Sequence, residues 1–199
     1  MKVIIFDTET TGLPNGGNDL DLQPYVCQFA AITYEYDGAS WQEVEVLDLL
    51  VRPEIPIPLM ATTIHGITDE MVMDKPAFTE IASQIVEAFQ KADVAVAHNL
   101  SFDQKILEIE LMRASLSKQF LPSQTFDTMT ETKELCQLPG RHSNFKAPRL
   151  MELHQFLFSE KFDRAHNALN DVKATARCLQ ELAVRSVFIA EEPSQGALF

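Results

Sequence analysis

The chain has 199 residues, of which 46% are hydrophobic and 23% are charged, and its formal net charge is −13 at pH 7. This length suits one domain with a sizeable core, and no window is apolar over the roughly 18 residues that a membrane span needs. The acidic balance argues against a protein that coats nucleic acid without regard to sequence.

The charge is unevenly distributed along the chain. Residues 1–100 hold 16 acids and 4 bases, a net charge of −12, whereas residues 101–199 hold 13 acids and 12 bases, a net charge of −1. An anionic substrate is therefore expected to approach a surface built by the second half. The cysteines Cys27, Cys136 and Cys178 are odd in number and widely spaced. This predicts neither a disulfide framework nor a cysteine metal site, and it indicates a reducing cytoplasm.

The first half of the chain predicts strands before helices. The opening KVIIFDTET is short and rich in β-branched residues, which favours a buried strand, and its apolar run is too short for a secretory signal. Residues 14–24 are full of turn formers and predict a loop, and the proline-broken residues 52–58 predict an irregular segment. Further strands are expected at residues 25–36 and 41–51, joined by a turn at 37–40, and a helix over residues 78–90.

The second half alternates one short strand with helices. The apolar VAVA at residues 94–97 predicts a buried strand. Helices are expected from Ser101 to about Met112, near residues 129–135, over about 148–158, and from just after His166 to about Ala183. Three meandering strands followed by helix, strand and helix imply a mixed α/β sheet with helices on its faces.

Two acids follow the first apolar run. Because side chains alternate along a strand, Asp7 and Glu9 are expected on the same face. Paired carboxylates at the edge of a core repel each other, so either one pKa rises or a cation binds between them. Oxygen ligands without cysteine or clustered histidine suit Mg²⁺ or Mn²⁺. The alternative is that the strand ends in solvent and both acids are ordinary surface residues.

Two more acidic motifs come at the ends of core elements. Asp103 lies in the first turn of the helix after strand 94–97, where favourable interaction with the helix dipole is the alternative explanation. Asp171 lies beside the apolar stripe of the last helix, so it is expected to face inward. His166 precedes that helix, and a plain polar role is the alternative for it.

In this order, the motifs resemble the DnaQ-like, DEDDh-type 3′–5′ exonucleases. The matching segments are D-x-E in FDTETTG, the Asp of HNLSFD and H-x₄-D in HNALND, with IHGIT at residues 64–68 and FDT at 126–128 as further similarities. The resemblance covers about residues 1–185. It implies an α/β protein of RNase H-like fold, with a mixed five-stranded sheet of three antiparallel and then parallel strands, flanked by helices. Residues 1–187 would form the exonuclease domain and residues 188–199 a flexible tail.

The resemblance also implies a site. Asp7, Glu9, Asp103 and Asp171 would hold two divalent cations, Mg²⁺ or Mn²⁺. His166 would take a proton from the water that attacks the last phosphodiester, which releases a nucleoside 5′-monophosphate. The residues expected to contact substrate are Thr8, Thr10, His65, Gly66, Ile67, Asn99, Phe102, Arg141, Lys146 and Arg149. The last three belong to the basic stretch RHSNFKAPR, for which a solvated loop is the alternative.

The expected substrate is a single-stranded or frayed 3′ end of DNA, in proofreading or end trimming beside a DNA polymerase. The terminal QGALF resembles the Q-x-x-L-F peptide that docks on bacterial sliding clamps, which assigns this role to Gln195, Leu198 and Phe199, although Gly196 stands where the motif prefers Leu. RNA 3′ ends are the alternative substrate. Two other functions fit the sequence less well. An aspartyl-phosphate phosphatase would need Asp in place of Glu9. A catalytically inactive clamp-binding scaffold would not need the four acids, and unneeded buried carboxylates cost stability.

Overall fold

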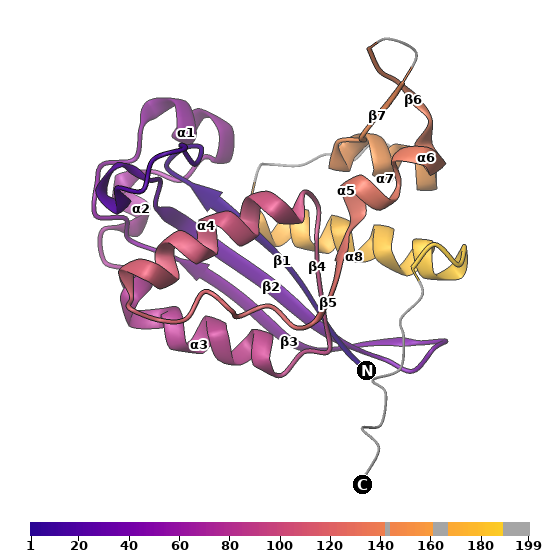
Figure 1. The fold of residues 1–199 in the computed structure, drawn as a ribbon, viewed down its shortest axis with the longest axis horizontal. Helices are drawn as coiled ribbons and strands as arrows, with labels where there is room; N and C mark the ends of the chain where they lie inside the picture. The colour runs from indigo at the N-terminus through magenta and orange to yellow at the C-terminus, as the bar shows by residue number, and fades with distance from the viewer. Residues whose placement is uncertain (142–143, 161–166, 189–199) are drawn as a thin grey trace, which may run out of the picture.

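The computed structural model describes residues 1–141, 144–160 and 167–188. Its centre is a five-stranded sheet in the order β3-β2-β1-β4-β5 (Figure 1). The strands are β1 (Lys2–Thr10), β2 (Val26–Tyr36), β3 (Trp41–Leu50), β4 (Val94–Ala97) and β5 (Gln124–Asp127). β1, β2 and β3 pair antiparallel, whereas β4 pairs parallel with β1 and β5 parallel with β4. The mixed RNase H-like sheet expected from the sequence is confirmed.

Helices cover both faces of this sheet. The described part of the chain has the helices α1 (Leu59–His65), α2 (Asp69–Val72), α3 (Phe78–Gln90), α4 (Leu100–Arg113), α5 (Thr128–Glu131), α6 (Lys133–Cys136), α7 (Leu150–Phe158) and α8 (Ala168–Val184), with a short 3₁₀ turn at Leu20–Leu22. A separate hairpin joins β6 (Leu138–Pro139) to β7 (Phe145–Lys146) and projects above α5 and α7 (Figure 1).

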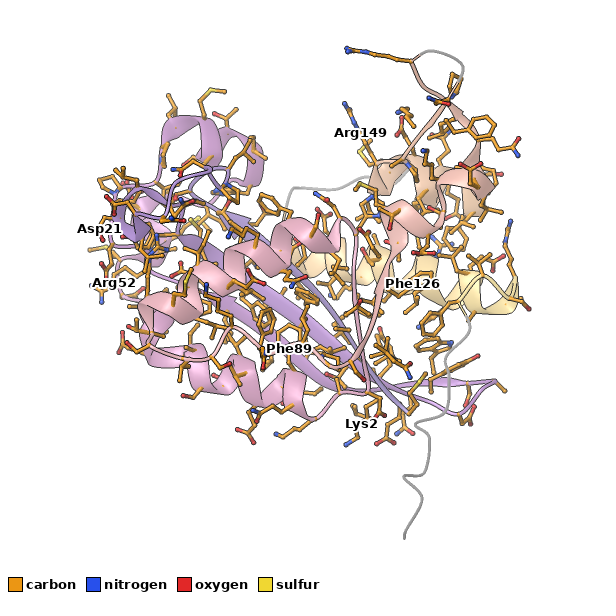
Figure 2. The ribbon with its side chains drawn as sticks, in the orientation of Figure 1. Lys2, Asp21, Arg52, Phe89, Phe126 and Arg149 are labelled. Carbon is orange, nitrogen blue, oxygen red and sulfur yellow. The ribbon has the colours of Figure 1, made fainter. Side chains whose placement is uncertain are left out.

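The core has two layers because β1 is buried on both faces. On one face α3 and α4 pack against Phe6 and Phe29, with Phe89 of α3 edge-on to Phe6 at 4.8 Å between ring centroids. Figure 2 shows Phe89 in this layer, between α3 and the sheet. On the other face α7 and α8 pack against Ile5 and Ile32. The continuous apolar run at the start of the chain is therefore the run of a central strand.

One predicted helix needs refinement, and the sequence did not predict several of the observed elements. The helix expected near residues 129–135 is two short helices, α5 and α6, which meet at Thr132. Helices α1 and α2, which follow the proline-broken segment, were not predicted from the sequence. The position of strand β5 was not predicted either. Within the described part of the chain, no helix has both the length and the apolar character to cross a membrane.

Candidate active site

The acids of three separate segments meet at the carboxyl end of β1. One carboxylate oxygen each from Asp7, Glu9 and Asp171 lies within 4.8 Å of the other two, and all three residues are half-buried. Asp7 and Glu9 share a face of β1, and Asp171 comes from the first turn of α8, which packs on β1. The predicted inward orientation of Asp171 follows from this packing.

Asp103 joins the same edge from the first turn of α4. Its side chain is 2% exposed, and its Oδ1 accepts hydrogen bonds from the backbone N–H of Thr8 at 2.9 Å and from the Thr8 hydroxyl at 2.6 Å. Burial raises the pKa of Asp103 from 3.8 to about 7, although the hydrogen bonds from Thr8 oppose this rise. The second acidic motif is therefore held against the first by direct contacts.

Burial and the neighbouring acids both disfavour the ionised form of Asp7. Its pKa lies well above the ordinary value of 3.8, first because of burial and then because of the charges of Asp103, Glu9 and Asp171. A group of carboxylates that repel each other in this way is relieved when a divalent cation binds between them. The donor set is all oxygen, so it fits Mg²⁺ or Mn²⁺.

A cleft of about 350 Å³ begins beside Glu9. It runs between the segment that follows β1, helix α1 and the start of α4, and its lining is mostly apolar. Four of the residues expected to contact substrate line it, namely Thr8, Thr10, His65 and Phe102. The ring of His65 is oriented by Nδ1, which accepts the backbone N–H of Ile67 at 3.0 Å.

The other expected residues of this region have backbone or packing positions. Gly66 has a φ of 76°, a left-handed conformation that ends α1 and suits glycine. Ile67 is buried with Cys27 and Ala61 in a small separate cluster. Asn99, with a φ of 74°, precedes α4 and donates its backbone N–H to Asp127 at 2.9 Å.

The sequence analysis missed several lining residues, among them three exposed apolar ones. Leu13, Met60 and Ile64 line the cleft while each is more than half exposed. In the sequence, these three residues are recognisable only as apolar residues in segments that lack the regular apolar spacing of a buried helix or strand. That signal does not distinguish a binding surface from ordinary exposed apolar residues.

The FDT segment has a structural part in the site. Asp127 accepts the backbone N–H of Asn99 and that of Met129, both at 2.9 Å, so it caps α5 and fixes the turn into α4. The hydroxyl of Thr128 lies 2.9 Å from His98 Nδ1, and His98 Nε2 lies 3.1 Å from the carbonyl of Pro148. Burial lowers the pKa of His98, so the neutral ring joins β4 to the start of α7.

The described residues of the basic stretch include β7 of the hairpin and lead into α7. Arg141 is exposed. Lys146 Nζ forms an ion pair with Glu152 at 2.5 Å, whereas Arg149 precedes α7 and projects from it in Figure 2. His166, Gln195, Leu198 and Phe199 lie outside the described residues, so their predicted roles stay predictions.

Comparison with known proteins agrees with this geometry. The RNase_T family, described as Exonuclease, matches residues 4–179. The DNA polymerase III subunit epsilon of Treponema pallidum is 32% identical over 168 residues, 84% of this chain and 70% of that protein. Exonuclease X, solved in complex with 5′ overhanging duplex DNA, has a TM-score of 0.62 and 28% identity over 94% of this chain and 95% of that chain. The nuclease domain of 3′hExo, a DEDDh family member bound to rAMP, shares the fold with a TM-score of 0.73 and 17% identity over 96% and 97% of the two chains.

The chain therefore belongs to the exonuclease family that these proteins define, and the resemblance to DnaQ-like, DEDDh-type enzymes is confirmed. Some relatives are much longer. The chain spans only 12%, 24% and 55% of the length of three other curated relatives, all named as DNA polymerase III proteins.

Proposed function

We propose that this exonuclease removes nucleotides from 3′ ends of DNA with two divalent cations, Mg²⁺ or Mn²⁺, held by Asp7, Glu9, Asp103 and Asp171. The observation that carries the proposal is the convergence of oxygens from Asp7, Glu9 and Asp171 within 4.8 Å, beside a cleft of nucleotide size. When bound, the cations would lower the pKa of water and offset the charge that builds up on the phosphate oxygens.

The protein's own groups bind and orient the substrate. The apolar cleft takes the terminal nucleoside, with the ring of Phe102 against its base, while the phosphodiester reaches the carboxylates at Glu9. His166, just before α8, would take the proton of the attacking water, since the pKa of an ordinary histidine lies near neutral pH. The water oxygen bonds to phosphorus, and the bond from phosphorus to the 3′ oxygen of the preceding nucleotide breaks. That oxygen takes up a proton and becomes the new 3′ hydroxyl of the strand, while the terminal nucleotide leaves as a nucleoside 5′-monophosphate.

We propose DNA rather than RNA as the substrate because Exonuclease X is 28% identical over almost the whole chain and was solved with DNA. Relatives named as epsilon subunits support a role in proofreading or end trimming with a DNA polymerase. The QGALF segment supports docking on a sliding clamp through Gln195, Leu198 and Phe199.

One experiment tests the substrate and the polarity of cleavage. The purified protein is given end-labelled single-stranded DNA, mismatched duplex DNA and single-stranded RNA of the same sequence, with Mg²⁺ or Mn²⁺. A 5′ label should shorten stepwise on DNA, and faster on the mismatched end than on a matched one. Faster digestion of RNA would replace the DNA assignment with an exoribonuclease, and cleavage from the 5′ end would reject the polarity.

A further inference from the structure

Two charged residues in the last turn of α4 have no part in the proposed chemistry. Glu110 and Arg113 form an ion pair at 3.1 Å, and their side chains are 2% and 11% exposed. We propose that Glu110 and Arg113 are positioning residues, which hold the Thr11–Leu13 segment of the cleft lining in place relative to Phe102. This inference rests on the proposed function, because it assigns the cleft to the terminal nucleoside.

Arg113 fastens the loop that follows the first strand. Its Nη1 donates to the carbonyl of Pro24 at 2.9 Å, and its Nη2 donates to the carbonyls of Leu20 and Gln23 at 2.5 and 2.8 Å. The guanidinium also lies over the ring of Tyr25, 3.6 Å from its centroid. The planar guanidinium can reach several carbonyls at fixed angles, which the single ammonium of a lysine cannot do.

Glu110 fastens the point where this loop enters β2. Its Oε1 accepts the backbone N–H of Val26 at 2.7 Å, and its other oxygen pairs with Arg113. Burial raises the pKa of Glu110, although Val26 and Arg113 oppose the rise. A buried ion pair is a poor source of stability compared with an apolar contact. What it supplies here is a set of directed bonds to the backbone between Leu20 and Val26.

That backbone is bonded directly to the cleft. Thr11 donates its N–H to the carbonyl of Tyr25, and the N–H of Tyr25 donates to the Thr11 hydroxyl, both at 2.9 Å. Thr11, Gly12 and Leu13 line the cleft, and so does Phe102, in the first turn of α4. Helix α4 therefore supplies one lining residue at its first turn and holds the Thr11–Leu13 part of the lining through its last turn.

The test compares two phosphodiesters, only one of which has a nucleoside to place in the cleft. These are thymidine 5′-(p-nitrophenyl phosphate) and bis(p-nitrophenyl) phosphate. Arg113→Met should raise KM for the thymidine ester by about tenfold, because a misplaced lining binds the nucleoside less well. Its kcat on that ester and its rate on the bis ester should stay within about twofold of wild type. Arg185→Met, which breaks an ion pair with Glu181 at the C-terminal end of α8, is the matched control and should change neither.

Arg113→Lys provides a second test if the methionine variant does not fold. It keeps the charge beside Glu110 but cannot reach three carbonyls, so KM for the thymidine ester should still rise. A wild-type KM in the folded variants, or an equal loss of rate on both esters, would reject the positioning role while leaving the exonuclease assignment intact. Inactivity of the wild type on DNA and on both esters would instead refute the proposed function, and this inference with it.

Discussion

Thr8 donates two hydrogen bonds to the same oxygen of Asp103, one from its backbone N–H and one from its hydroxyl. The two residues are 95 positions apart in sequence, so this contact joins β1 to α4 at the centre of the proposed metal site. Both bonds favour the ionised carboxylate, against the burial that raises the pKa of Asp103 to about 7.

Thr8→Val should therefore move the acid limb of the pH–rate profile to higher pH. Without the hydroxyl the pKa of Asp103 rises further, and as pH falls the carboxylate is protonated sooner and can no longer bind a cation. Thr8→Ser keeps the hydroxyl and should keep the profile. Profiles of kcat/KM between about pH 5 and 9 decide this, and identical acid limbs in all three proteins would contradict it.

Asp7→Ala should abolish hydrolysis in Mg²⁺ and in Mn²⁺ while the fold is kept. The pKa of Asp7 is raised by burial and by three neighbouring acids, so its removal relieves repulsion in the metal-free protein. Added Mg²⁺ should raise the Tm of wild type, because a ligand that binds only the folded state stabilises it, and should raise it much less in the variant. Near-normal turnover by Asp7→Ala, free of trace nuclease, would refute the metal site.

His166→Ala should lower kcat by roughly 10²–10⁴, the range for a lost general base, and leave the Mg²⁺-dependent rise in Tm largely unchanged. Wild-type activity should fall as pH drops through the histidine range, and the variant should keep only the part of this fall that comes from protonation of Asp103. The measurement is single-turnover hydrolysis of a labelled oligonucleotide. If the variant keeps the wild-type rate and profile, His166 is only a polar residue before α8.

The basic stretch should divide into residues that bind the strand and one that does not. Arg141→Gln and Arg149→Gln should raise KM for DNA and flatten its dependence on salt, because fewer counterions are released. Lys146→Gln is the internal comparison, since Lys146 is already paired with Glu152 and should change the slope least. If the salt dependence of KM has the same slope in wild type and in all three variants, the stretch is a solvated loop that does not bind the strand.

Deletion of residues 195–199 should remove binding to the host's sliding clamp without changing hydrolysis of short free oligonucleotides. The peptide would place Leu198 and Phe199 in an apolar pocket and hydrogen-bond through Gln195, with an affinity in the micromolar range, about −8 kcal/mol. Titration of clamp with full-length and truncated protein measures this. Equal binding by both, or no binding by either at high micromolar concentration, would exclude the docking role.

The sequence was most informative where periodicity and chemistry coincide. A period of two places Asp7 and Glu9 on one face of β1, and helical spacing identifies the buried stripe of α3. Helix α1 escaped detection because LMATTIH holds three β-branched residues, and it is short and follows prolines. β5 has four residues without a buried run.

Contacts between distant segments could not be predicted. Nothing in the sequence pairs Lys146 with Glu152, or brings Leu13 and Met60 to the same cleft. These contacts depend on how loops return to the sheet, which local propensity does not determine. The loop at residues 14–24 was correctly expected as a loop, but its fastening to Arg113 required the structure.

The packing of α8 against β1 has a consequence for the newly made chain. Asp7 and Glu9 leave the ribosome early, but Asp171 follows only when nearly the whole domain has been made, and domains generally fold as units. A nascent or prematurely ended chain that stops before α8 therefore has the first acids without the last and lacks one of the two helices that cover one face of the sheet. Cleavage activity should thus appear only when the ribosome has made the whole domain through α8.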